Sequence, residues 1–405
     1  MTTEKRTVAD GAGVRFPLGF CLTALLAHGM LEIGGFPVID WAVSLWRYLA
    51  FLITLVFFCR KPVIGKIDVV WALLGVWVFF TTVLGNGSLP LVIGPAIDII
   101  CLIMIFKLLQ YDMEQFVQKA TWILSAFCYL NVVLVILFPD GLWMNPESGK
   151  AGFLLGGNYN GMGPRCLVAL ATNMLCYRHG RVYAVNFWFL YVVSVFTVLF
   201  VGSMTSSVCL VMLLGLWWAA KWLKWRRGLI WTFFAFYMLA QVAVVFVSTN
   251  LEQYPVLKDF VEDTLQKDFT FTHRTVIWEE CQRIVSQSPW VGYGVQDNDW
   301  NNEHIDGPGP HNFVYRMLID GGFPLLVLCV LCIILNLKPA YRSNDRRMCY
   351  LLLGINVLFF MMIWEFYPFF VIAYILLLCY YGSISSLDCQ SRQGGIENKS
   401  VIPVK

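Results

Sequence analysis

The chain has 405 residues; 58% of them are hydrophobic, 16% are aromatic and only 14% carry a charge. Because an average soluble domain has roughly 25% charged residues, this composition excludes a water-soluble fold. The net charge is only +3, and no Lys/Arg-rich run is interleaved with exposed aromatic residues, so nucleic acid is excluded as a partner.

Apolar stretches long enough to cross a membrane recur along the whole chain. A helix needs about 20 apolar residues to cross a hydrocarbon core of roughly 30 Å. The expected spans start near Phe16, Trp41, Ile67, Leu89, Ala120, Met162, Val182, Thr205, Gly228, Phe313, Cys349 and Phe369. The predicted fold class is therefore all-α: a polytopic integral membrane protein of about twelve transmembrane helices.

The charges of the connecting segments predict an orientation. Lys and Arg gather after every second span, at 60–66, 107–119, 178–181, 221–227 and 338–347. With both termini included, about 21 of the 29 Lys and Arg residues fall on one side, which the positive-inside rule makes cytoplasmic. We therefore expect a multi-pass protein of a bacterial inner membrane with both termini in the cytoplasm.

This orientation predicts where the polar chemistry lies. The expected organisation is a cytoplasmic N-terminus (1–15), nine spans (16–248), a large external loop (249–312), three spans (313–387) and a cytoplasmic tail (388–405). The tail has too little apolar content to fold. A shorter external segment runs from Asp140 to about Gly161, and we expect the functional site in these two external segments.

Residues 272–288 of the large loop predict an amphipathic helix, because apolar residues recur at helical spacing opposite polar ones. Such a helix can lie at the lipid headgroups with Trp278 as an interfacial anchor, or it can pack on other helices. Arg274 stands at its start, where free backbone N–H groups favour a phosphate. The alternative for Arg274 is an ordinary surface arginine.

Glycines and prolines between Pro289 and Pro310 predict an irregular loop that holds His311 at the mouth of the next span. Histidine suits the removal of a proton from a sugar hydroxyl, although a cap-like hydrogen bond at the helix start is the alternative. Trp300 and nearby Asn and Asp residues are candidates for sugar contact, or simply a solvated loop. A calcium loop at 297–308 is rejected, because its sixth position is Asn302 and its twelfth is Pro308.

Together these residues resemble the O-antigen ligase and polymerase superfamily. The resemblance rests on an arginine followed by a tryptophan, a Pro-x-x-Gly-x-Gly turn, and a His-Asn pair that opens a helix carrying a glycine about nine residues later. In this chain these are Arg274, Trp278, Pro289, Gly292, Gly294, His311, Asn312 and Gly321. The segment 156–163, which contains Asn158 and Asn160, is similar to an Asn-rich segment of the same family.

The resemblance implies an inverting, metal-independent glycosyltransferase without a cofactor. Its donor would be a glycan on undecaprenyl diphosphate and its acceptor a glycan hydroxyl, with membrane lipid, a flippase and a chain-length regulator as further partners. His311 would be the base and Arg274 would neutralise the departing diphosphate. The substrate-binding residues implied are Arg165, Arg316, Arg47, Asn158, Asn160, Asn312 and Trp300.

One position departs from the family pattern. The family has a Ser-Arg pair on the outer side of a central span, whereas this chain has Ser203 followed by Met204. Arg165, Arg47 and Arg316 are the candidates to supply the missing charge. Charged groups inside spans usually face a partner, so we expect Arg316 to pair with Asp320, and Asp98 to pair with Arg165 or Arg47.

Three functions remain open at this level. A polymerase lengthens a lipid-linked glycan, and a ligase transfers the finished glycan to lipid A-core or to protein; the signature residues are common to both. We favour the polymerase, because capsule and exopolysaccharide assembly by this superfamily does not require an outer membrane. A lipid-linked oligosaccharide flippase or transporter is the alternative of another class, but its polar residues would lie near the midplane rather than in one external loop.

Overall fold

The computed structural model describes residues 16–33, 35–60, 62–110, 112–144, 151–222, 226–247, 274–343, 345–364 and 369–397. Within these ranges, the side chains of 226–227, 242–247, 275 and 386–397 are not described. The expectations for residues 1–15, 249–273 and 398–405 lie outside the described residues.

The described residues form helices and one short hairpin. The helices are α1 (Leu18–Met30), α2 (Pro37–Cys59), α3 (Lys66–Leu84), α4 (Pro90–Leu108), α5 (Met113–Leu137), α6 (Tyr159–Cys176), α7 (Arg181–Phe200), α8 (Met204–Trp222), α9 (Arg226–Val247), α11 (Arg274–Gln287), α12 (Asn298–Ile305), α13 (Phe313–Arg342), α14 (Arg346–Met361) and α15 (Phe369–Glu397). The hairpin pairs β1 (Trp143–Met144) with β2 (Ala151–Gly152) in antiparallel fashion. Each expected span corresponds to one of these helices.

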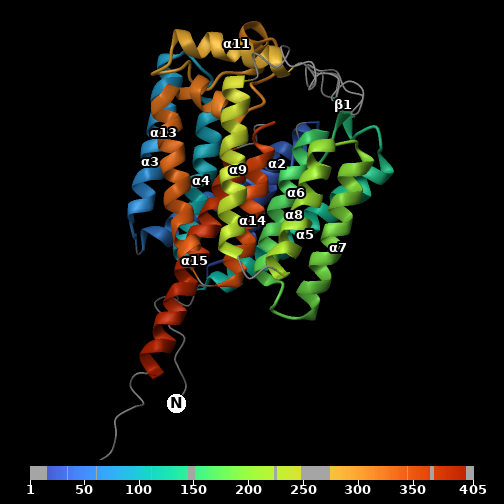
Figure 1. Ribbon diagram of the computed structural model, residues 1–405, viewed down its shortest axis with the longest axis vertical. Coiled ribbons are helices and arrows are strands. Elements are labelled where there is room, and N and C mark those ends of the chain that lie inside the picture. Colours follow the sequence, from blue (N-terminus) through green and yellow to red (C-terminus); the bar gives the residue numbers. More distant parts are fainter. Residues whose placement is uncertain are drawn as a thin grey trace, which may run out of the picture.

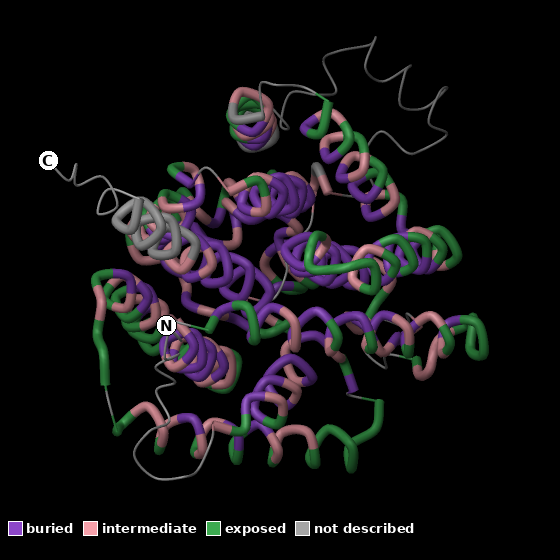
Figure 2. The backbone as a smooth tube through the Cα atoms, turned by 90° about the horizontal axis from the view of Figure 1, so that it is seen from below, coloured by how far each residue is buried: buried purple, intermediate pink, exposed green. Residues whose placement is uncertain are grey.

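The predicted all-α, polytopic membrane fold is confirmed. Seven of the described helices are long and apolar enough to cross a membrane: α2, α3, α4, α5, α7, α8 and α13. Shorter apolar helical segments occupy 18–30, 228–241 and 369–385. Burial is deepest in α6 and α14, whereas α2, α3 and α7 carry many exposed apolar side chains. Buried residues gather in the middle of the bundle and exposed ones on its periphery, as Figure 2 shows. This pattern suits lipid, which is as apolar as these side chains.

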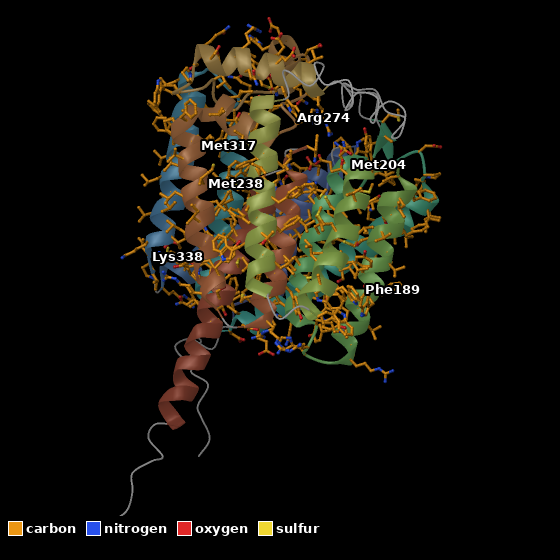
Figure 3. All side chains as sticks on the ribbon, viewed as in Figure 1. Phe189, Met204, Met238, Arg274, Met317 and Lys338 are labelled. Atoms are coloured by element: carbon orange, nitrogen blue, oxygen red, sulfur yellow. The ribbon has the colours of Figure 1, made fainter. Side chains whose placement is uncertain are left out.

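The helices run roughly side by side, and α11 lies across one end of the bundle (Figure 1). Arg274 is at this end, which we call the α11 end, and Lys338 is at the opposite end (Figure 3). The start of α8, at Met204, also lies toward the α11 end. Arg274 and Lys338, which belongs to the Lys- and Arg-rich segment 338–347, therefore lie at opposite ends of the bundle.

Two expectations for irregular structure were wrong. The loop predicted between Pro289 and Pro310 contains α12, which begins where the Asp297 side chain accepts a hydrogen bond from the backbone N–H of Trp300 (3.0 Å). The tail predicted not to fold continues α15 as far as Glu397. Once a helix has formed, each further residue adds a hydrogen bond without a new nucleation step.

Candidate active site at the α11 end

The predicted amphipathic helix is confirmed as α11, and it packs on other helices. Ile277, Trp278, Cys281 and Ile284 are buried, and Glu279 on the opposite side is exposed. The buried four form one cluster with side chains of α12 and α13. Of the two arrangements left open by the sequence, the structure therefore has the helix-packing one.

Trp278 is not an interfacial anchor, because only 1% of it is exposed. Its indole Nε1–H donates a hydrogen bond to the carbonyl oxygen of Pro310 (2.9 Å), and its ring lies 6.1 Å from that of Trp364. A buried indole N–H needs a partner, and here that partner directly precedes His311. Gln282, one turn further along α11, donates from Nε2 to the hydroxyl of Tyr315 on α13 (3.0 Å).

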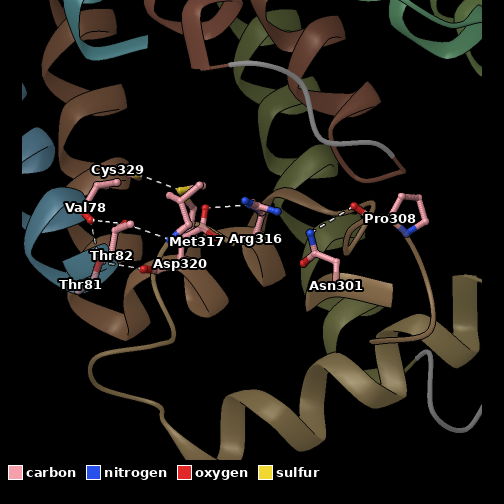
Figure 4. Close-up of polar contacts among 10 residues, drawn as sticks. Val78, Thr81, Thr82, Asn301, Pro308, Arg316, Met317, Asp320 and Cys329 are labelled. Carbon is pink, nitrogen blue, oxygen red and sulfur yellow. Dashed lines mark hydrogen bonds and ion pairs between the residues drawn. The ribbon is translucent and has the colours of Figure 1, made fainter. Parts of the chain in front are cut away.

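The helix that follows His311 is interrupted one third of the way along. Gly321 and Gly322 have non-helical backbone angles, with φ/ψ of −161°/17° and 68°/−168°. A break leaves helix carbonyl groups without their usual partners. Groups outside α13 bind them: Tyr293 N to Ile319 O (2.6 Å), Thr81 Oγ1 to Asp320 O (2.9 Å) and Trp77 Nε1 to Gly321 O (2.9 Å) (Figure 4 shows the bond of Thr81).

The Pro-x-x-Gly-x-Gly turn is the element that fits into this break. Phe323 N donates to Pro289 O (2.8 Å), so the turn binds both sides of the interruption. A Cβ atom at Gly292 would lie 2.4 Å from Ile319 O, and one at Gly322 would lie 2.4 Å from the carbonyl carbon of Trp290. Both glycines also have positive φ, of 70° and 68°. These motif glycines therefore shape the backbone that supports the site.

His311 occupies a left-handed backbone conformation, with φ of 48°, and is partly buried. The N-cap of α13 is Asn312, whose Oδ1 accepts from the backbone N–H groups of Val314 (2.9 Å) and Tyr315 (3.1 Å). The capping position itself is therefore taken by Asn312. His311 stands at the corner between the loop and the helix.

Asn312 is fully buried, and its amide is used inside the protein. Besides its capping bonds, its Nδ2 donates to Ile363 O (3.0 Å), and its Oδ1 accepts from Nε2 of Gln241 (3.2 Å). We predicted substrate binding for Asn312, but the structure gives it a supporting position. Gln241, a polar residue within the apolar part of α9, was not singled out from the sequence; its place in an apolar segment was the available signal.

Arg274 is the first residue of α11, as predicted, and one helical turn separates it from Trp278. Residues four apart lie on the same face of a helix. The tryptophan one turn after Arg274 thus binds the carbonyl that directly precedes His311.

Arg316 and Asp320 pair along the first segment of α13, as predicted. Nε of Arg316 donates to Oδ2 of Asp320 (2.8 Å; Figure 4), and both side chains are mostly buried. Arg316 follows His311 by five residues on the same segment. It therefore lies close to the candidate site, with part of its charge balanced by the carboxylate.

Arg165, Asn158 and Asn160 come from the start of α6. Asn158 is the N-cap of this helix and accepts from Gly161 N (2.8 Å). Arg165 is buried and donates from Nη1 to Gly161 O (3.0 Å). Asn160 is partly exposed within the first turn.

The end of α14 links this part of α6 to the His311 corner. The methyl of Met361 would be 3.0 Å from a Cβ atom at Gly163 of α6. The next carbonyl, of Met362, accepts from the backbone N–H of Phe313 (3.1 Å). The segment 202–206, where the family arginine is missing, also reaches α6: Ser206 Oγ would be 2.1 Å from the same Cβ atom of Gly163.

Arg47 packs between α1 and α4. Its Nη1 lies 3.5 Å from Oδ2 of Asp98, which confirms Arg47 as a partner of that carboxylate. His28, which the sequence analysis missed, completes the cluster: Nδ1 is 2.9 Å from the same Oδ2, and Nε2 accepts from Arg47 Nη1 (2.8 Å).

Trp300 lies on α12 and stacks on His304, with ring centroids 4.2 Å apart and planes at 9°. Its other neighbour is Tyr293 of the turn, at 5.4 Å. Sugar contact by Trp300 stays a prediction, and the stacked imidazole covers one face of the indole.

Comparison with known proteins adds one match. Residues 189–330 match the family model described as O-antigen ligase, and the match covers the segment from α7 to α13 that contains Arg274, the glycine turn and His311. Neither the curated proteins nor the solved structures give a match. This match supports the resemblance to the O-antigen ligase and polymerase superfamily that the sequence motifs indicated.

Proposed function

We propose that this protein is an inverting glycosyltransferase on the outer face of the bacterial inner membrane. It polymerises oligosaccharide repeat units carried on undecaprenyl diphosphate into O-antigen, capsular polysaccharide or exopolysaccharide. The family match supports glycosyl transfer of the ligase or polymerase type. The observation that carries the proposal is the bond from Trp278 to Pro310, which ties His311 to the helix that starts with Arg274.

The proposed reaction is a direct displacement. The acceptor hydroxyl oxygen attacks the anomeric carbon of the donor while its proton passes to the imidazole of His311. The bond from that carbon to the diphosphate oxygen breaks, and the electron pair leaves with undecaprenyl diphosphate. Arg274 neutralises the charge that develops on this leaving group, and His311 then returns its proton to water.

Arg165 is the proposed substitute for the missing family arginine. The segment 202–206 and Arg165 meet at Gly163, two residues before Arg165 on α6. The end of α14 lies against both Gly163 and the His311 corner. This placement supports Arg165 as a second positive charge beside the His311 corner.

Glycan extension by purified protein tests the proposal. We expect the wild-type protein, given a lipid-linked repeat unit in detergent with EDTA, to make longer lipid-linked glycans. Arg274→Ala and His311→Ala should each lower turnover by about 100-fold or more. Arg283→Ala is the matched control, because this α11 arginine is exposed and pairs with Glu280 across one helical turn; it should stay within about two-fold.

The products separate the alternatives. Polymers on undecaprenyl diphosphate support the polymerase, whereas transfer only to a lipid A-core acceptor would identify a ligase. Detergent removes the two compartments between which a transporter works, so extension in detergent contradicts a pure flippase. Loss of activity in EDTA that a divalent ion restores would contradict the metal-independent step.

A further inference from the structure

Two features fix the backbone on either side of His311. The residue has a φ of 48°, a strained conformation for a non-glycine residue that persists only where its surroundings impose it. On one side, Pro310 O accepts from Trp278; on the other, the Asn312 side chain caps α13 and binds Ile363 O. These bonds fix the backbone from which the His311 side chain projects.

The bond from Trp278 connects the backbone beside His311 to α11. Trp278 is buried in the cluster that joins α11 to α13, so its indole has little freedom to follow a moving loop. The bonds of Asn312, in contrast, connect the same corner to α9 and to the segment directly after α14. The indole bond thus relates the corner directly to the helix that carries Arg274.

We propose that Trp278 is a positioning residue: its indole N–H fixes the Pro310 carbonyl and so sets the place of the His311 imidazole relative to Arg274. The inference rests on the proposed role of His311 as the base; Trp278 is only 1% exposed and acts through the Pro310 carbonyl. A small displacement of a general base lowers the rate of proton transfer without changing how tightly the donor binds.

The test removes the N–H and keeps the ring. Trp278→Phe should lower kcat about 10-fold at unchanged KM for the lipid-linked donor. In the His311→Ala background the same change should cost less than about two-fold, because residues that act through one another are not additive. Trp290→Phe is the matched control: its ring is 68% exposed and packs on Phe323, and it should change neither quantity.

A second readout follows His311 without activity. The rate at which diethylpyrocarbonate modifies His311, measured by peptide mass spectrometry, should change at least three-fold in Trp278→Phe and stay unchanged at His304. If Phe disturbs folding, benzothienylalanine at position 278 replaces the N–H by sulfur within the same bicyclic shape. An unchanged modification rate, with or without a loss of turnover, overturns the positioning role.

The two readouts also separate this inference from the proposed function. A changed His311 modification rate with full turnover would support the positioning by Trp278 and overturn His311 as the base. Equal losses from Trp278→Phe in the wild-type and His311→Ala backgrounds would show that Trp278 acts independently, which overturns the inference alone.

Discussion

The backbone N–H of Tyr293 donates to the carbonyl of Ile319 (2.6 Å), in place of the helix bond that α13 gives up at its break. This contact joins the glycine turn at residues 289–294 to the helix that begins beside His311. The first segment of α13 is consequently bound to the turn on one side and to α11 on the other. The motif glycines thus act on the site through the backbone.

Replacing Gly322 by alanine should destabilise the protein. The Cβ atom would lie 2.4 Å from the Trp290 carbonyl carbon, and the residue has a φ of 68°. Strain and the displaced turn should together lower the free energy of unfolding by at least about 2 kcal/mol. Thermal unfolding in detergent measures this change.

Gly75 and Gly215 are the controls, because a Cβ atom at either meets no other atom within 4 Å and both lie within helices. Alanine at these positions should be neutral or stabilising by up to about 1 kcal/mol. Equal stability of Gly322→Ala and the two controls would contradict the account of the break.

The Asp98 cluster predicts a difference between single and double substitutions. Asp98→Asn leaves the buried Arg47 without its carboxylate and should cost about 3–5 kcal/mol of stability. Replacing both by apolar residues, as in Arg47→Met with Asp98→Leu, should recover most of that loss. Unfolding in detergent compares the two, and a double variant as unstable as the single one would rule out an ion-pair explanation.

The proposed role of Arg165 predicts a rescue. Arg165→Ala should lower turnover by about 100-fold, since a positive charge near the leaving group is lost. Adding Met204→Arg recreates a Ser-Arg pair after Ser203 and should restore activity at least 10-fold. Kinetic assays of the single and double variants decide this, and the idea fails if Met204→Arg gives no recovery in a folded protein.

The sequence predicted the helices well, because each long apolar stretch has one structural solution in lipid. Every expected span has a helix that starts within a few residues of the predicted position, except that α5 begins at Met113, seven residues before Ala120. The amphipathic pattern likewise predicted α11, and four-residue spacing predicted the pair of Arg316 and Asp320.

The arrangement around His311 could not be predicted in the same way. The bond of Trp278 to Pro310 and that of Tyr293 to Ile319 join residues far apart in the chain, and single-sequence patterns contain only local spacing. His28 was missed for the same reason, since its partners are on α2 and α4. A polar residue in an apolar stretch indicated that a partner exists without indicating which one.

The central claim, that Arg274 and His311 face the outside of the cell, is tested most directly by labelling with a membrane-impermeant thiol reagent. Asp299→Cys places a thiol at an exposed position of α12, and native Cys59 is exposed at the end of α2. Burial raises the pKa of the Cys281 thiol and keeps it unreactive, so the nearest native cysteine of the loop adds no background.

Residue 299 should be labelled in right-side-out vesicles, and Cys59 only in inverted ones. Labelling of residue 299 confined to inverted vesicles would place the site in the cytoplasm and contradict the account.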